Sequence, residues 1–125
     1  MRIIAVILLI IFIFTLAIYG YNKLSAYAED IYILLNDLEN NIKNDNWDMA
    51  NIHKEKLKEK WDESQKRIAL MIDHTDFHDL NIVMTEIYFL IEQRERDKVL
   101  REITIAKELT QQLAEQAKPI LENIF

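Results

Sequence analysis

The residues with the most obvious chemistry lie in one short segment, Asp73-His74-Thr75-Asp76-Phe77-His78-Asp79. Its two imidazoles and three carboxylates could bind zinc or another divalent cation, with His74 and His78 four residues apart as on one helical face. The segment also lies where one predicted helix ends and another begins, and capping by Asp76 would place His74 before the second helix. Because spacing fixes no third ligand, we expect a capped turn, with Asp73, His74 and His78 as weak candidates for metal binding.

Other residues of catalytic type lack the context that catalysis needs. The chain has no cysteine, which excludes disulfides, thiolate zinc sites and cysteine nucleophiles. Ser25 and Ser64 are not set in the tight glycine turns that expose a nucleophilic serine. Glu86 and Glu92 flank a predicted helix stripe without an evident partner. We therefore predict that the protein is not an enzyme and uses no cofactor.

Charged side chains form two runs of mixed sign, 54–60 and 94–98. In the first run, opposite charges fall three residues apart, as on a solvated helix face. The second run lies at a predicted turn between two helices. We predict that its cations, Arg94, Arg96 and Lys98, bind a protein partner, and the alternative is a turn that is only solvated.

The net charge argues against nucleic acid as the partner. The chain carries a formal charge of −6, and leaving out the first 21 residues removes only the cation Arg2, so the remainder carries −7. A surface that binds nucleic acid or anionic lipid headgroups needs clustered cations, which this balance opposes.

The N-terminal segment is apolar enough to cross a membrane. Between Ile3 and Tyr19 no residue is charged, and Thr15 is the only interruption. At about 1.5 Å per residue this stretch spans roughly 26 Å, which Gly20 and Tyr21 extend to a full crossing. We predict a transmembrane anchor over residues 1–21 and a helical domain over residues 22–125.

The orientation of this anchor depends on few charges. Arg2 precedes the apolar stretch, which favours the N-terminus inside the cell membrane and the domain outside, by one charge. Ala26-Tyr27-Ala28 has the form of a signal peptidase site but lies well past the apolar core. We therefore favour an uncleaved, single-pass anchor over cleavage after Ala28.

Beyond Asn22 the apolar residues recur at steps of three and four, the spacing of amphipathic helices. The chain has one Gly and one Pro, so it has few residues suited to the positive-φ turns of β-hairpins. The four stripes run from Leu24 to Ile42, from Trp47 to Met71 (with Lys54 and Ser64 at two of its steps), from Phe77 to Ile91 and from Val99 to Ile120.

Three short polar separators join these stripes and offer N-caps: Asp45 or Asn46, then Thr75 or Asp76, then Asp97. Turns this short make neighbouring helices antiparallel. The predicted fold is all-α, an N-terminal transmembrane helix followed by a four-helix antiparallel bundle. Two αα-hairpins of tetratricopeptide type are the alternative, but the signature of that repeat's first helix is missing.

Two groups of large apolar residues have two interpretations each. Trp47 and Trp61 are fourteen residues apart and share a helix face, so they anchor the core or form an exposed binding platform. The C-terminal pairs Ile120-Leu121 and Ile124-Phe125 fold back onto the bundle or form a free recognition tail. We favour the core role for both.

Several of these features together resemble a known family. They are the apolar N-terminus, Asp45-x-Trp47-x-x-Ala50, Trp61, Asp73-His74-Thr75 and the ending Leu121-Glu122-Asn123-Ile124-Phe125. The sequence is similar over essentially its whole length to domain-of-unknown-function family 4363, small bacterial proteins with an N-terminal anchor. This resemblance implies an architecture and no assigned reaction, so no functional residue carries over.

The function that we predict is a non-enzymatic, membrane-anchored interaction or assembly module facing outward from a bacterial membrane, with a protein partner and no nucleic acid. A ligand- or metal-responsive extracytoplasmic sensor domain is the alternative. Sensor bundles usually signal to a second domain across the membrane, and here only two residues precede the apolar stretch.

Overall fold

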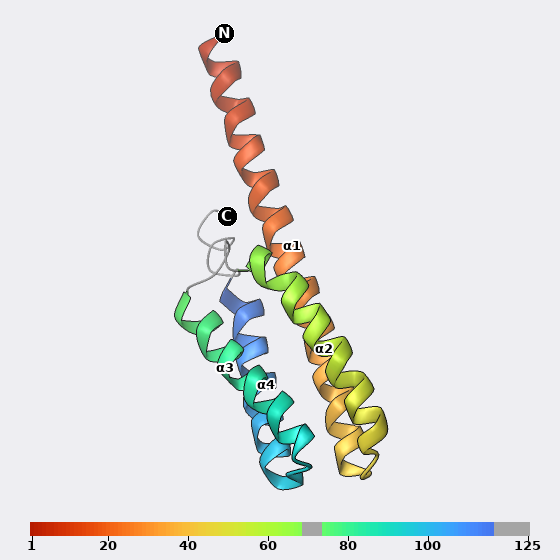
Figure 1. The fold of residues 1–125 in the computed structure, drawn as a ribbon. Helices are drawn as coiled ribbons and strands as arrows, with labels where there is room; N and C mark the ends of the chain where they lie inside the picture. The colour runs from red at the N-terminus through yellow and green to blue at the C-terminus, as the bar shows by residue number, and fades with distance from the viewer. Residues whose placement is uncertain (69–73, 117–125) are drawn as a thin grey trace.

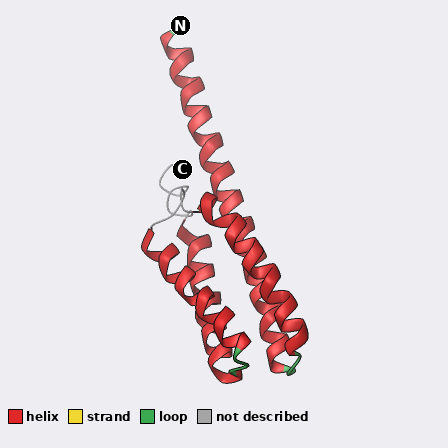
Figure 2. Cartoon of the chain, in the orientation of Figure 1, coloured by secondary structure: helices red, strands yellow, loops and turns green. Residues whose placement is uncertain are grey.

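Four helices account for nearly all of the described chain. A computed structural model describes residues 1–68 and 74–116. The helices are α1 (Arg2–Lys43), α2 (Trp47–Ile68), α3 (His74–Glu92) and α4 (Arg96–Gln116). The described residues contain no strand, and the all-α prediction is confirmed (Figures 1 and 2).

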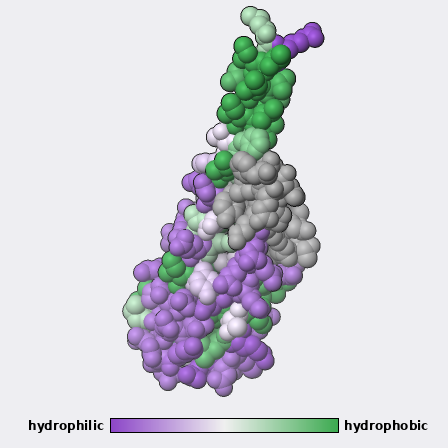
Figure 3. All heavy atoms as spheres, turned by 180° about the vertical axis from the view of Figure 1, so that it is seen from behind, coloured by the Kyte–Doolittle hydropathy of each residue, from purple (hydrophilic) through white to green (hydrophobic). Residues whose placement is uncertain are grey.

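Helix α1 combines two segments that face different surroundings. Its N-terminal part projects beyond the other helices (Figure 1), and its large apolar side chains from Ile3 to Tyr19 are mostly exposed. Figure 3 shows this part as an apolar column above a mainly hydrophilic bundle. The same helix continues without a break past Gly20 and Asn22, and Leu24 is its first buried apolar residue.

The predicted stripes form the core of the bundle. Every stripe member whose side chain the structure describes is buried or half-buried, and the spacing of three and four places these residues on the inner face of each helix. Even the polar residues at stripe positions, Lys54, Ser64 and Thr110, are buried. Fully buried large side chains include Leu24, Ile31, Leu35, Leu38, Ile42, Leu57, Trp61, Leu80, Met84, Ile87, Ile91, Ile103 and Leu113.

The helices form a ring in which consecutive helices are antiparallel. Helix α1 packs against both α2 and α4, and α3 packs against α4, whereas α2 and α3 contact each other least. Within the described residues neither diagonal pair, α1 with α3 or α2 with α4, makes contacts. The molecule is thus two helical hairpins joined mainly through α1 and α4, as Figure 1 shows.

The start of α2 agrees with its predicted cap. The side-chain Oδ1 of Asn46 accepts a hydrogen bond from the backbone N–H of Met49 at 3.3 Å. This bond satisfies one of the free N–H groups at the helix start. Asn46, one of the two predicted candidates, is therefore the N-cap.

The other two predicted caps are wrong. Helix α3 begins at His74, so Thr75 and Asp76 lie inside its first turn. Helix α4 begins at Arg96, which places Asp97 in its first turn as well. Acidic residues are favourable throughout a first turn because they face the positive end of the helix dipole. A run of polar residues therefore offers several equivalent start points.

Candidate functional site

Two turns of nearly identical geometry form one end of the bundle. They cover residues 44–46 and 93–95, and each has one non-glycine residue at positive φ, Asp45 at 54° and Arg94 at 52°. In both turns this residue donates its N–H to the carbonyl three residues earlier, at 3.1 Å. The next residue donates to the carbonyl five residues earlier, at 2.8 Å and 3.1 Å respectively. This pattern is the Schellman motif, in which glycine is the usual residue at positive φ.

Arg94 is the less expected of the two residues. Left-handed backbone costs an L-residue with a long side chain roughly 1–2 kcal/mol, whereas Asp tolerates it better because of its short polar side chain. Glycine adopts this backbone conformation without the steric cost that arginine has. An arginine at an exposed turn in this conformation is a reason to look for a function there.

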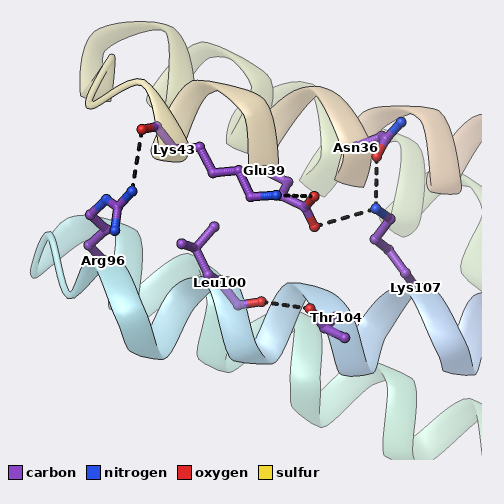
Figure 4. A network of polar contacts seen from close by, with 7 residues as sticks. All are labelled: Asn36, Glu39, Lys43, Arg96, Leu100, Thr104 and Lys107. Carbon is purple, nitrogen blue, oxygen red and sulfur yellow. Dashed lines mark hydrogen bonds and ion pairs between the residues drawn. The ribbon is translucent and has the colours of Figure 1, made fainter.

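Arg96 connects the two turns. Its Nη2 donates to the backbone carbonyl of Lys43 at 3.4 Å (Figure 4). Its Nε lies 3.6 Å from Oδ1 of Asp45. Nη1 is also 3.5 Å from Asp97. The two turns therefore lie side by side at the end of the bundle farthest from the apolar segment (Figure 1).

The predicted docking cations thus differ in role. Arg96 is engaged by the first turn, so its charge is partly balanced within the chain. Arg94 and Lys98 are exposed, and Lys98 lines a groove with Phe89 and Leu90. Of the three, Arg94 and Lys98 are the ones whose charge is best placed to meet another molecule.

A second polar network joins α1 to α4 beside this end (Figure 4). Lys107 donates to Asn36 at 2.7 Å and lies 3.4 Å from Glu39, which also pairs with Lys43 at 3.1 Å. Lys107 Nζ is 5.2 Å from the ring centre of Tyr32 as well. Burial opposes ionisation of Glu39, but the hydrogen bonds and charges of the two lysines outweigh it and lower the pKa of Glu39. The network therefore holds an ionised carboxylate at the α1/α4 seam.

The histidine segment takes a helical form. His74 and His78 both belong to α3, so the predicted break between them is wrong and they do lie four residues apart on one helix. His78 is exposed, and Asp73 lies outside the described residues. Among the described residues, no three His, Cys, Asp or Glu side chains gather as a metal site would require. Metal binding by His74, His78 and Asp73 stays an untested alternative.

The tryptophans contribute to the core. Trp61 is 1 % exposed, stacks on Phe77 with ring centres 5.3 Å apart, and donates its indole N–H to Asn81 at 2.9 Å. Trp47 is half-buried against the same core. Trp61 is therefore a core anchor that joins α2 to α3, which confirms the core interpretation over the exposed platform. The C-terminal pairs from Ile120 to Phe125 lie outside the described residues.

Comparison with known protein families supports the resemblance noted above. Residues 18–124 match the family described as domain of unknown function (DUF4363). The chain belongs to this family. No curated protein and no solved structure matches the chain.

The matched DUF4363 region includes the site once considered for cleavage. Tyr27 and Ala28 are buried in the core, and the Tyr27 hydroxyl accepts a hydrogen bond from Arg67 at 2.7 Å. The side chain of Lys60 lies over the Tyr27 ring as well, at 5.5 Å from its centre. Cleavage after Ala28 would remove Leu24, Tyr27 and Ala28 from the packed domain. The uncleaved chain is the form that keeps this core complete.

Some polar residues of the DUF4363 domain have roles that spacing did not reveal. Lys54 is buried on α2, with its Nζ 3.6 Å from both Glu55 and Glu92. The hydroxyls of Ser64 and Tyr88 are buried and find no hydrogen-bond partner among the described residues. Burial, and then the charges of Asp62 and Glu55, raise the pKa of Tyr88. The positions of Lys54 and Ser64 on an apolar stripe were the signals in the sequence that pointed to these buried polar groups.

Proposed function

We propose that this protein is a non-enzymatic, membrane-anchored module that presents a helical bundle to a protein partner. The observation that carries the proposal is α1 itself. The one candidate membrane span in the described residues begins this helix, and none of its most apolar window is buried by the rest of the chain. In water such an exposed apolar column would be unfavourable, whereas a bilayer supplies the apolar surroundings that it lacks.

The continuity of α1 supports anchoring over removal of a signal sequence. The helix runs through Gly20 into the core, and its next turns supply Leu24, Tyr27 and Ala28 to the packed domain. With the apolar column in the bilayer, the bundle would extend by about 1.5 Å per residue from Asn22 to Lys43, or roughly 30 Å. The paired turns would then be the part of the protein farthest from the membrane.

Membrane fractionation tests the anchor. We expect the full chain to stay in the membrane pellet after alkaline carbonate washing, with its N-terminus intact by mass spectrometry. Replacing Leu9 and Phe12 with Lys should release it, because each lysine at mid-span costs about 2.5–3.5 kcal/mol. A soluble product that starts at Glu29 would show that the segment is a cleaved signal.

Charge reversal at the paired turns tests whether this end of the bundle binds a partner, and it leaves Arg96 and its contacts with the first turn unchanged. Arg94→Glu with Lys98→Glu should lower recovery of crosslinked protein partners, and the loss should be greater at low salt because exposed charges act mainly on the association rate. Lys56→Glu with Lys58→Glu, two exposed lysines on α2, is the matched control. Equal recovery from both double variants would mean that the turns at this end are only solvated.

A further inference from the structure

One stripe of α1 continues from the apolar segment into the bundle. Tyr19, Lys23 and Tyr27 follow one another at steps of four residues, so they share one side of the helix. Tyr19 closes the apolar run, and Tyr27 is buried in the core. The Nζ of Lys23 lies over the ring of Tyr19, 5.6 Å from its centre. Lys23 is therefore at the boundary between the apolar column and the bundle.

The last turn of α2 lies beside this stripe. Helix α2 runs back toward the apolar segment, and Figure 1 shows its end next to α1 at the base of the projecting part. Arg67 donates from Nη1 to the hydroxyl of Tyr27 at 2.7 Å. This hydrogen bond raises the pKa of Arg67, and electrostatic interactions with Glu63 and Tyr19 add to the rise. Arg67 thus interacts with the tyrosines on both sides of Lys23, so the two cations lie on the same side of α1.

Cations are nearest the apolar segment on both helices of this hairpin, and carboxylates lie farther from it. On α2 the last turn carries Lys66 and Arg67, whereas Glu63 is four residues before Arg67, about 6 Å along the helix. On α1 Lys23 comes first, and Glu29 follows six residues later, about 9 Å along the helix. The α1/α2 hairpin therefore has a basic end next to the apolar segment.

We call Lys23, Lys66 and Arg67 the boundary cluster. Lys66 and Arg67 are exposed, and Lys23 is half-buried. Within residues 1–68 and 74–116 none of the three forms an ion pair, whereas Lys60, seven residues before Arg67, pairs with Asp30 at 3.3 Å. The dipole of α2 favours cations in its last turn, but it does not account for Lys23, which belongs to α1.

We propose that the boundary cluster binds the headgroup of an anionic phospholipid. The proposal rests on the proposed membrane anchor, which places Tyr19 at the edge of the bilayer. Lys23 then lies about 6 Å beyond this edge, within the Debye length of about 8 Å at physiological ionic strength. The hydrogen bond to Tyr27 holds Arg67 at the same boundary, and the planar fork of a guanidinium matches the oxygens of a phosphate.

Charge determines the class of lipid. A zwitterionic headgroup carries an ammonium that cancels its phosphate, whereas an anionic headgroup brings a net negative charge to the three cations. The negative net charge of the domain, which argued against anionic lipid, is an average over the whole surface. Near the same end, Asp79 and Glu115 belong to α3 and α4, on the other hairpin. The proposed contact therefore involves only the α1/α2 side of the bundle.

The lipid that the full chain retains tests the proposal. The chain is reconstituted in nanodiscs of phosphatidylcholine with a minor share of phosphatidylglycerol, released in mild detergent and measured by native mass spectrometry. We expect phosphatidylglycerol to be retained in preference to phosphatidylcholine. Lys23→Gln with Arg67→Gln should lower this retention about thirtyfold, because each cation near an anionic surface contributes about fivefold to affinity.

Two further double variants separate the effect of charge from that of the fold. Lys56→Gln with Lys58→Gln makes the same charge change at exposed lysines of α2, and Lys58 is nine residues before Arg67, about 14 Å along the helix. This variant should retain lipid as the wild type does. Lys23→Arg with Arg67→Lys keeps both charges and should also retain it. If Arg67→Gln lowers helicity by circular dichroism, Lys23→Gln with Lys66→Gln gives the same comparison and spares the hydrogen bond to Tyr27.

Other outcomes overturn the proposal. Equal retention of the two lipids by the wild type would show that the cluster has no preference for anionic headgroups. An equal loss from the Lys56 and Lys58 variant would mean that only the total charge matters. Displacement of phosphatidylglycerol by inorganic phosphate would assign the cluster to a free anion. Carbonate washing separates the two proposals: a chain released from membranes means that the anchor fails, and a membrane-bound chain without lipid preference means that only the lipid site fails.

Discussion

The two seams that join the hairpins are built differently. The α1/α4 seam has an apolar interior and a polar edge in which Glu39, Lys107 and Asn36 are all satisfied (Figure 4). The α2/α3 seam depends on Trp61 and has two buried hydroxyls without partners among the described residues. Many small contacts therefore stabilise the α1/α4 seam, whereas one large side chain stabilises the α2/α3 seam. We expect mutations at the two seams to change the free energy of unfolding by different amounts.

The largest effect is expected at the α2/α3 seam. In a chain beginning at Asn22, Trp61→Ala should lower the free energy of unfolding by about 3–5 kcal/mol, because it removes a buried aromatic residue that contacts Phe77 and Asn81. Chemical denaturation followed by circular dichroism gives this value. Trp47→Ala, at a half-buried tryptophan of the same helix, should cost clearly less. Equal losses from the two variants would contradict the idea that this seam depends on a single residue.

At the α1/α4 seam we expect a smaller loss that depends on pH. Glu39→Gln removes the ion pairs with Lys43 and Lys107. The Lys107 side chain is only 18 % exposed, so the variant should lose about 1 kcal/mol of unfolding free energy at pH 7. Because the fold lowers the pKa of Glu39, its contribution is complete above the usual glutamate pKa of about 4.3 and is lost as pH falls through the lower folded value.

Thermal melts of the wild type and Glu39→Gln should therefore differ at pH 7 and converge as the pH falls below the lowered folded pKa of Glu39. A constant difference at every pH would mean that the variant changes packing and not charge.

Two tyrosines provide the smallest and sharpest comparison. Tyr88→Phe removes a buried hydroxyl that has no hydrogen-bond partner in residues 1–68 and 74–116. It should leave stability unchanged or raise it slightly, because an unpaired polar group is costly to bury. Tyr27→Phe removes the acceptor of the Arg67 hydrogen bond and should cost about 1 kcal/mol. Stability measured for both variants would contradict this account if Tyr88→Phe were the more damaging.

The end turns allow a further comparison between the hairpins. Arg94→Gly should stabilise the bundle by about 1 kcal/mol, and Asp45→Gly by less, because aspartate tolerates positive φ better than arginine. Unchanged stability of Arg94→Gly, measured by denaturation, would indicate that interactions of the arginine side chain offset the energetic cost of its positive φ.

The spacing of apolar residues predicted the four helices well, because burying one face of a helix requires apolar residues at steps of three and four along the local sequence. The residues from Leu24 to Ile42 and from Val99 to Leu113 are buried as their spacing indicated. Helix starts at His74 and Arg96 were misplaced because neighbouring polar residues can serve equally in a cap or a first turn.

The polar contacts of the site could not be predicted in the same way. Arg96 with Lys43 and Glu86 with Glu102 join residues on different helices, whose relative rotation the sequence pattern does not state. Arg96 was accordingly treated as a free cation, and the Glu86 partner was missed. The Tyr88 hydroxyl is buried without a partner among the described residues, and burial of this kind depends on how the helices pack together.

With the proposed anchor in a bilayer, the unbroken course of α1 would couple the tilt of the membrane segment to the tilt of the bundle. A helix without a hinge transmits tilt and twist, so a thinner or thicker bilayer would lean the whole bundle and change the reach of its far end. Each residue inserted near Gly20 would rotate the bundle by about 100° around the helix axis. A methyl group added at Gly20 meets nothing within 4 Å. Gly20→Ala should therefore stiffen α1 without changing the contacts of the bundle.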